Sequence, residues 1–184
     1  MHLQGKEVFF YMNFARIKES RNELLNVKSL VGISLLTALN VACGAFEIQL
    51  TPLLKIGFAS VFAGACGMFY GPIPTAFACF VADHLKFLIN PGGPYFIGFP
   101  INEMLIGFIY GCFFYKQKLS VKRTIAARLC VTVLINLILT PIWLNIMYQN
   151  PLFTTVRVVK NVLLFPFDAA LLYVVLKATE KIKH

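Results

Sequence analysis

Long uninterrupted apolar runs are the feature of this sequence that most constrains its fold. A helix that crosses a bilayer needs about 20 mostly apolar residues, within a range of about 17–25. Six stretches approach that length, the second being short: 29–46, 55–70, 72–89, 99–115, 126–147 and 155–177. Their apolar residues are continuous rather than alternating, which favours helices over the strands of a membrane barrel. The sequence therefore predicts an all-α integral membrane protein with six transmembrane helices.

The composition agrees with this class. Of the 184 residues, 58% are hydrophobic and 14% are charged, and the mean hydropathy is +0.73. These values exclude a disordered chain and disfavour an ordinary soluble domain. The formal net charge of +9 does not indicate a nucleic-acid partner, because the basic residues cluster between apolar runs, where membrane topology accounts for them.

The distribution of Lys and Arg predicts the orientation of the chain. Basic residues precede the first run, separate the fourth from the fifth and follow the sixth, whereas EIQLTPLL, NPGGPYFIG and YQNPLFT on the other side contain none. Because basic residues concentrate in cytoplasmic loops, both termini are predicted to be cytoplasmic. The chain then divides into an interfacial segment, 1–28, with an amphipathic helix over 16–28, and a six-helix membrane domain, 29–184.

Polar side chains within the sixth run are candidate functional residues, because ionisable groups in a membrane helix are costly and need a partner. Arg157, Lys160, Asn161 and Asp168 follow helical spacing and share one face. Two interpretations stay open here. Either Arg157 and Lys160 contact a ligand, or they extend to the outer headgroups while Asp168 forms a buried ion pair.

Further polar and aromatic candidates occur on the third, fourth and fifth runs and in the loop before the fourth. They are Asp83, Lys86, Tyr95, Phe96, Phe99, Asn102, Glu103, Asn136 and Trp143. Together they predict a pocket that opens to the outside and is floored within the membrane. Cations suit ligand carboxylates, whereas aromatic side chains with an amide or carboxylate suit a flat nitrogenous ring. Structural alternatives are an ion pair of Asp83 with Lys86 or Lys160, and an interfacial anchoring role for Trp143.

The sequence lacks the common motifs of catalysis and metal binding. GxxxxGK[ST], HExxH and GxSxG are absent, and His2, His84 and His184 are scattered. We therefore expect no enzyme activity, no ATPase motif, no cofactor and no metal. On the first run, Ala38 and Ala42 form a small-xxx-small pair, which in lipid permits close approach of another helix, either within the chain or from a partner.

Four stretches resemble the substrate-binding S component of energy-coupling-factor (ECF) vitamin transporters, and more narrowly the folate-specific S component. They are LTALNVA, MFYGPIPTAFACFVADHLKFLINPGGPYFIGFPINEMLIGFIYG, LTPIWLNIMY and RVVKNVLLFP, within roughly 29–177. The resemblance implies a multi-pass protein of a prokaryotic cell membrane that captures a vitamin from outside. It also implies partners, namely a membrane coupling subunit, contacted by Ala38 and Ala42, and two cytoplasmic ATPases.

For a folate ligand, the resemblance implies roles for the candidate residues. Arg157 and Lys160 would receive the glutamate carboxylates, and a carboxylate among Asp83, Glu103 and Asp168 would pair with the pterin N–H groups. The amides and rings among the candidates would complete the contacts, beneath outer loops at 47–54 and 90–98. Alternatives are another vitamin, such as riboflavin, thiamin or pantothenate, or a small membrane scaffold without a ligand, whose outer polar groups would all be paired internally.

Overall fold

The computed structural model describes most of the chain, and most of the described part is helical. The described residues are 15–45, 48–51, 54–56, 59–91, 94–148 and 152–181. Within them, only the backbone is described for 45, 48–51, 54–56, 148, 152–160, 162 and 163. After a helical stretch at 15–22, the elements are η1 (Glu23–Leu25, 3-10), α2 (Val27–Ala45), β1 (Ile48–Thr51), β2 (Leu54–Ile56), α3 (Ala59–Tyr70), α4 (Pro72–Ile89), α5 (Gly98–Phe114), α6 (Val121–Val131), η2 (Thr132–Leu139, a π-helix), α7 (Thr140–Tyr148) and α8 (Leu152–Glu180).

The prediction of a helical membrane protein is confirmed for the body of the chain. Among the described residues, three helices are long and apolar enough to cross a membrane: Val27–Gly44, Pro72–Ile89 and Val121–Met147. Two shorter apolar helices, α3 and α5, lie between them in the chain. The long α6–η2–α7 helix begins at Val121, five residues before the predicted start at 126, because the basic first turn extends the helix beyond its apolar part.

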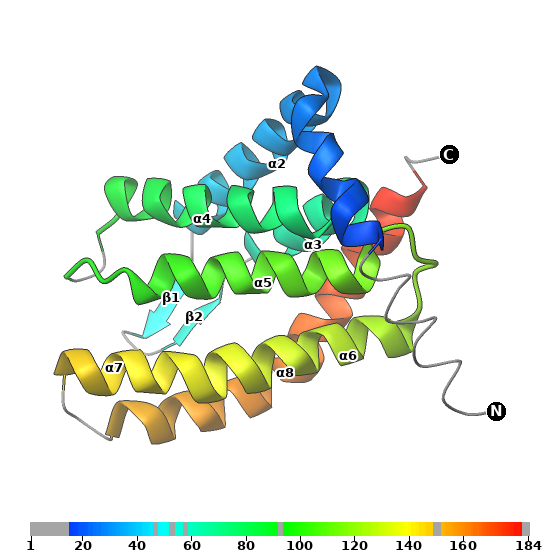
Figure 1. Ribbon diagram of the computed structural model, residues 1–184. Coiled ribbons are helices and arrows are strands. Elements are labelled where there is room, and N and C mark those ends of the chain that lie inside the picture. Colours follow the sequence, from blue (N-terminus) through cyan, green and yellow to red (C-terminus); the bar gives the residue numbers. More distant parts are fainter. Residues whose placement is uncertain are drawn as a thin grey trace.

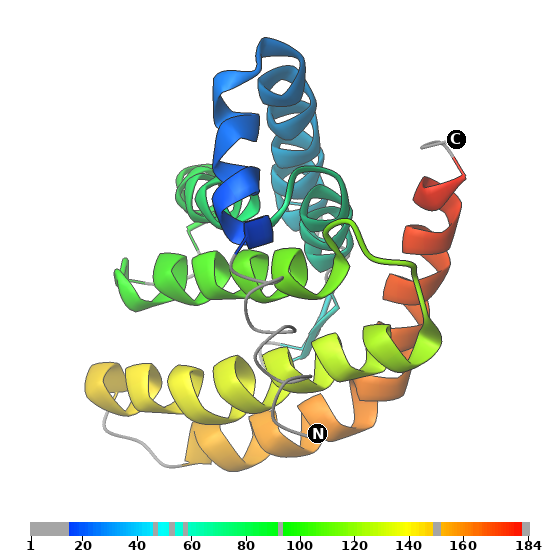
Figure 2. The ribbon, with the colours of Figure 1, turned by 45° about the vertical axis from the view of Figure 1, so that its right-hand side comes forward.

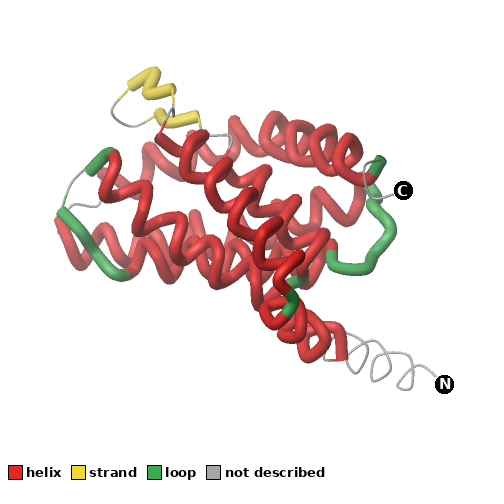
Figure 3. The backbone as a smooth tube through the Cα atoms, turned by 90° about the horizontal axis from the view of Figure 1, so that it is seen from above, coloured by secondary structure: helices red, strands yellow, loops and turns green. Residues whose placement is uncertain are grey.

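A two-stranded sheet adds to the predicted helices. β1 and β2 pair antiparallel, with Ile48 opposite Ile56 and Gln49 opposite Lys55. β-branched Ile and Thr residues favour the extended chain. The strands project from the helical body (Figure 3). β1 thus lies in the predicted loop, whereas β2 takes the first residues of the helix predicted over 55–70, which begins only at Ala59.

The helices lie in two groups on either side of α5. α4 packs along α5, α3 packs against both, and α2 packs against α3 and α4, whereas α6, η2 and α7 pack with α8 on the other side (Figure 1). One end of this bundle carries the α4–α5 loop, the end of α7 and the start of α8, and we call it the aromatic end. The other carries residues 15–22, the α5–α6 loop and the end of α8, and we call it the basic end.

Close backbone contact holds α5 against the first group. A Cβ added to Gly111 would lie 2.2 Å from the Cα of Pro72, and one added to Gly67 would lie 2.8 Å from the backbone nitrogen of Gly111. Only residues without a side chain allow such an approach, which in lipid supplies much of the attraction between helices. The start of α4 and the middle of α3 are therefore fixed against the last turns of α5.

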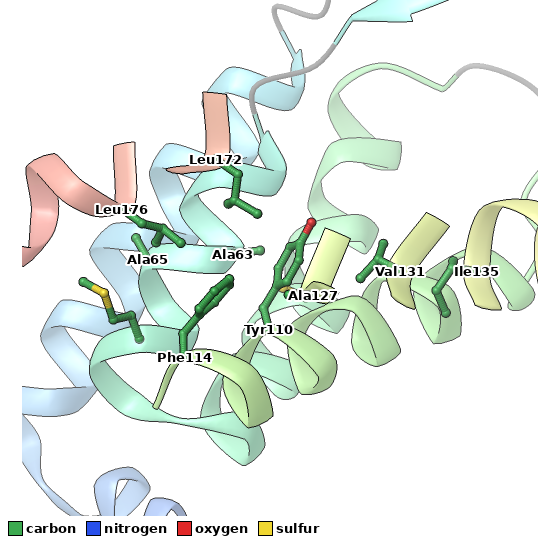
Figure 4. Packing of buried hydrophobic residues seen from close by; sticks show 11 residues of the cluster. Ala63, Ala65, Tyr110, Phe114, Ala127, Val131, Ile135, Leu172 and Leu176 are labelled. Atoms are coloured by element: carbon green, nitrogen blue, oxygen red, sulfur yellow. The ribbon is translucent and has the colours of Figure 1, made fainter. Parts of the chain in front are cut away.

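The hydrophobic core lies where α5 meets α3, α6 and α8. Tyr110 and Phe114 of α5 are almost fully buried, between Leu172 of α8 and Ala127 of α6 (Figure 4). Two backbone irregularities occur in the elements around this core. η2 interrupts the α6–α7 helix, and α8 bends along its length, with Pro166 inside it (Figure 2). Proline removes a helical hydrogen bond and π-turns re-register a helix, so both explain departures from straight helices.

Candidate functional site

A hydrogen-bonded chain of three side chains connects α5 to α7 near the aromatic end. Trp143 Nε1 donates to Asn102 Oδ1 at 3.0 Å, and Asn102 Nδ2 donates to Thr140 Oγ1 at 3.1 Å. Asn102 is only 5% exposed. Its amide therefore has both kinds of polar atom engaged, and it fixes the position of the Trp143 indole. Asn102 and Trp143 were both predicted site residues, and the structure brings them together.

Aromatic rings continue this cluster into the α4–α5 loop. The Phe96 ring lies 5.6 Å from the Trp143 ring and 6.1 Å from the Phe99 ring, measured between centroids. Gly98 lies tightly between them, because an added Cβ would be 2.5 Å from Phe96 and 2.8 Å from Trp143. Phe96, Phe99 and Trp143 are only half-buried. The apolar faces of these predicted rings are thus gathered at one place, as stacking on a flat ligand would require.

The fourth predicted aromatic residue, Tyr95, faces α4 instead. Its hydroxyl lies 2.7 Å from His84 Nε2, and His84 Nδ1 lies 2.8 Å from the Phe80 carbonyl oxygen. Because that carbonyl only accepts, Nδ1 donates; in the neutral ring Nε2 then accepts from the Tyr95 hydroxyl. The Phe87 ring adds an edge contact at 5.1 Å. Tyr95 therefore anchors the loop that carries Phe96.

Three predicted polar residues around the cluster have no hydrogen bond or ion pair with any described residue. They are Glu103 on α5, Asn136 on η2 and Asn161 on α8, all half-buried. Glu103 follows Asn102 directly, and Asn136 lies one helical turn before Thr140. Fully buried polar groups are normally paired, whereas half-buried ones can still meet water or a ligand. Polar side chains without a partner among the described residues are available to a polar ligand.

The predicted residues of α4 lie on its α2-facing and loop-facing sides. The Lys86 stem covers Gly44, where an added Cβ would be 2.7 Å from the Lys86 Cδ. Asp83 is half-buried on the same helix.

For two predicted residues the structure describes only the backbone. Arg157 and Lys160 are within α8, near its start at the aromatic end, but their side chains are not described. The backbone places both on the segment that leads to Asn161. Their contact with a ligand stays a prediction.

Asp168, the remaining predicted site residue, belongs to a second polar cluster. Its carboxylate pairs with the Arg128 guanidinium of α6, whose Nη1 donates to the Tyr110 hydroxyl at 3.1 Å. Tyr110 lies eight residues beyond Asn102 on α5, about 12 Å along the helix axis. An ion pair was an alternative for Asp168, but Arg128 was missed. The signal was available, because Arg128 is the one basic residue within the fifth apolar run.

Ala38 and Ala42 lie on the outward face of α2. Both are exposed, as are Leu35 and Val31, which lie one and two turns before Ala38. The opposite face carries Asn40, which is 3% exposed and donates from Nδ2 to the Ala59 carbonyl at 3.0 Å. Internal packing is therefore assigned to the other face of α2, and the alanine pair remains accessible to lipid or to a partner helix.

Comparisons with known proteins agree with one another in coverage. The family of ECF-type riboflavin transporter S components matches residues 24–177. The folate transporter FolT of Clostridium novyi (strain NT) is 33% identical over 160 residues, or 85% of this chain and 92% of the relative. FolT of Leuconostoc mesenteroides is 29% identical over 161 residues, which are 83% of this chain and 86% of the relative. A crystal structure of FolT bound with folic acid superposes with a TM-score of 0.74 at 38% identity, covering 82% of this chain and 94% of that chain.

Proposed function

This chain belongs to the ECF-transporter S-component family and is similar to folate transporters of that family, and from that premise we propose that it is a folate-binding subunit of a vitamin importer. The single observation that carries the ligand assignment is the likeness to a FolT structure bound with folic acid over 94% of that chain. The aromatic-end cluster supports it, because it offers stacking surfaces beside polar groups that have no partner among the described residues.

The proposed roles follow from chemistry and position. Phe96, Phe99 and Trp143 stack on the pterin, and Glu103 accepts hydrogen bonds from its amino and ring N–H groups. Asn136 and Asn161 complete that edge. The cations of Arg157 and Lys160 receive the glutamate carboxylates, since charge-assisted hydrogen bonds are stronger than neutral ones. Asp168 is left out of this set, because Arg128 already pairs with it.

Riboflavin is the second candidate ligand, favoured by the name of the matching family. Titration of the purified chain with folic acid, riboflavin, thiamin and biotin decides between the candidates. We expect saturable binding of folic acid alone. Saturable riboflavin binding without folic acid binding would refute the folate assignment and retain the family. Binding of none would favour a scaffold without a ligand.

We further propose six membrane spans with both termini in the cytoplasm. α2, α3, α4, α5, the continuous α6–η2–α7 helix and α8 provide them. α3 has 12 residues and is about 18 Å long, shorter than a hydrocarbon core of about 30 Å. It spans only together with its flanking segments. The basic end faces the cytoplasm, because Lys and Arg concentrate there. Cysteine accessibility from each side of sealed vesicles tests this orientation.

The last part of the proposal concerns partners. We infer that the exposed Ala38 and Ala42 dock on a membrane coupling subunit that works with two cytoplasmic ATPases, so that this chain binds the vitamin and hydrolyses no ATP itself. Ala38→Trp or Ala42→Trp should retain folic acid affinity but abolish ATP-dependent uptake in vesicles with the whole complex. Leu129→Trp, on an exposed face of α6, is the matched control. Normal uptake by both alanine variants would remove the docking role, and loss of binding would indicate internal packing.

A further inference from the structure

The segment 15–26, which precedes α2, has a buried face that packs against the basic end. Its helical part stands at a steep angle to α5 instead of running along it (Figure 2). Ser20 is completely buried, and its hydroxyl lies 3.5 Å from the backbone N–H of Ile73. Leu24 packs on the small cluster of Ile33, Cys66 and Ala78. This segment is therefore a docked part of the fold with a defined outward face.

Both acidic residues in the described part of this segment, Glu19 and Glu23, have hydrogen-bond partners within the protein. Glu19 Oε1 accepts from Lys116 Nζ at 2.5 Å, and this hydrogen bond raises the pKa of Lys116. Glu23 Oε2 accepts from the Ser29 hydroxyl at 2.5 Å and Oε1 from the Tyr115 hydroxyl at 3.4 Å. Their negative charge is thus directed to internal partners and does not neutralise the outward face.

Cations and apolar side chains remain on that outward face. Lys18, Arg21 and Lys28 are exposed, and their side chains form no hydrogen bond or ion pair with any residue that the structure describes. Beside them, Leu25 is 83% exposed and Val27 is 72% exposed. Val27 is also the first residue of the candidate membrane span in α2. The cations therefore lie at the level where a span leaves the hydrocarbon core.

We propose that Lys18, Arg21, Leu25, Val27 and Lys28 form a docking surface for anionic phospholipids, which we call the lipid corner. The cations bind headgroup phosphates, and the two apolar side chains enter the adjoining acyl region. Charge complementarity selects anionic lipids over zwitterionic ones, since the positive charge on this face is not offset. Each cation near an anionic membrane surface contributes about fivefold in binding.

The test measures lipid selectivity of the full chain. The protein is purified in detergent and incubated with equal amounts of phosphatidylglycerol and phosphatidylcholine, and native mass spectrometry gives the ratio of bound lipids. Wild-type protein should prefer phosphatidylglycerol. The triple variant Lys18→Gln, Arg21→Gln, Lys28→Gln should lose about 10- to 100-fold of this preference, and the charge-preserving Lys18→Arg, Arg21→Lys, Lys28→Arg should retain it.

A matched control separates the lipid corner from net charge. Lys118→Gln, Lys122→Gln, Lys181→Gln removes three other exposed lysines of the basic end and should keep the preference within about threefold. Leu25→Ser with Val27→Ser should weaken retention of both lipids while leaving their ratio unchanged. An equal loss in both charge-removing triples, or no loss in the first, overturns the proposal. So does an unselective wild type, which would instead favour a protein partner on this face.

Discussion

The two polar clusters along α5 differ in charge, in burial and in what they leave unpaired. At the aromatic end, Asn102 joins Thr140 and Trp143 through neutral hydrogen bonds, with half-buried rings beside it. Nearer the basic end, Arg128 joins Asp168 and Tyr110, and Tyr110 is completely buried. Near the first cluster, Glu103 and Asn136 have no partner among the described residues. In the second, the two charges pair with each other, although the buried Arg128 Nε has no hydrogen bond to a described residue.

This difference separates the binding role that we propose for the first cluster from the structural role of the second. A carboxylate paired with a guanidinium in a membrane core has little left for a ligand, and removing either partner leaves a charge without compensation. The neutral cluster positions an indole without fixing any charge, so a polar ligand can supply the missing partners. The position of a polar residue in a membrane helix therefore says less about its role than its pairing does.

The largest expected effect tests the structural cluster. Arg128→Leu or Asp168→Leu should lower the free energy of unfolding in detergent by about 3–5 kcal/mol, because one buried charge loses its partner. The double variant Arg128→Met, Asp168→Leu should recover most of the lost stability, because it leaves no unpaired charge. Arg123→Leu is the control, because the Arg123 guanidinium donates to the carbonyl oxygen of the exposed Lys118. Its free energy of unfolding should differ from that of the wild type by less than about 0.5 kcal/mol. If Asp168→Leu unfolds like the wild type but no longer binds folic acid, Asp168 belongs to the ligand site instead.

The next effect tests the charge at the aromatic end. Arg157→Ala and Lys160→Ala should each weaken folic acid binding by about ten- to a hundredfold, because a hydrogen bond to a charged group contributes about 1.5–3 kcal/mol. Unfolding should change little, since this end of α8 can be solvated. Calorimetric titration measures the affinity, with Lys177→Ala at the other end of the same helix as the control. Wild-type affinity in both variants would show that these cations extend to headgroups.

A smaller effect is expected within the neutral cluster. Asn102→Leu removes both hydrogen bonds and should reduce stability by about 1–3 kcal/mol, whereas Thr140→Val removes one and should cost about 1 kcal/mol. Folic acid affinity should fall more in Asn102→Leu, because the indole loses its fixed position. Equal affinities in the two variants would mean that Asn102 does not position Trp143 for the ligand.

The smallest effect concerns the loop anchor. Tyr95→Phe keeps the ring contact with Phe87 but removes the hydrogen bond to His84, and Tyr95 is 45% exposed. Loss of such a hydrogen bond should cost about 0.5–1 kcal/mol of binding free energy, which lowers the affinity for folic acid about two- to fivefold. The dissociation rate of folic acid should rise accordingly. Tyr173→Phe is the control, and an unchanged rate in Tyr95→Phe would exclude the anchor from binding.

The sequence predicted the helical membrane class and most residues of the aromatic-end cluster, because polar groups in apolar runs are conspicuous. It could not predict that Asn102 meets Trp143, since the relative register of two helices is a tertiary property. The partner of Asp168 was accessible in principle, as a lone arginine in an apolar run needs a counter-charge. The π-turns of η2 have no comparable local signal, and the sheet of β1 and β2 is too short for alternation to reveal it.

Trp143 is the one tryptophan of the chain, and its place in the cluster has an optical consequence. The ultraviolet emission of the protein excited at long wavelength comes from this indole alone, and its Nε1–H is held by Asn102 beside the Phe96 ring. A heteroaromatic ligand that stacks there and absorbs in the near ultraviolet quenches this emission by energy transfer. The intensity of this emission would therefore report, without any added label, whether the folic acid that we propose as ligand is bound beside Trp143.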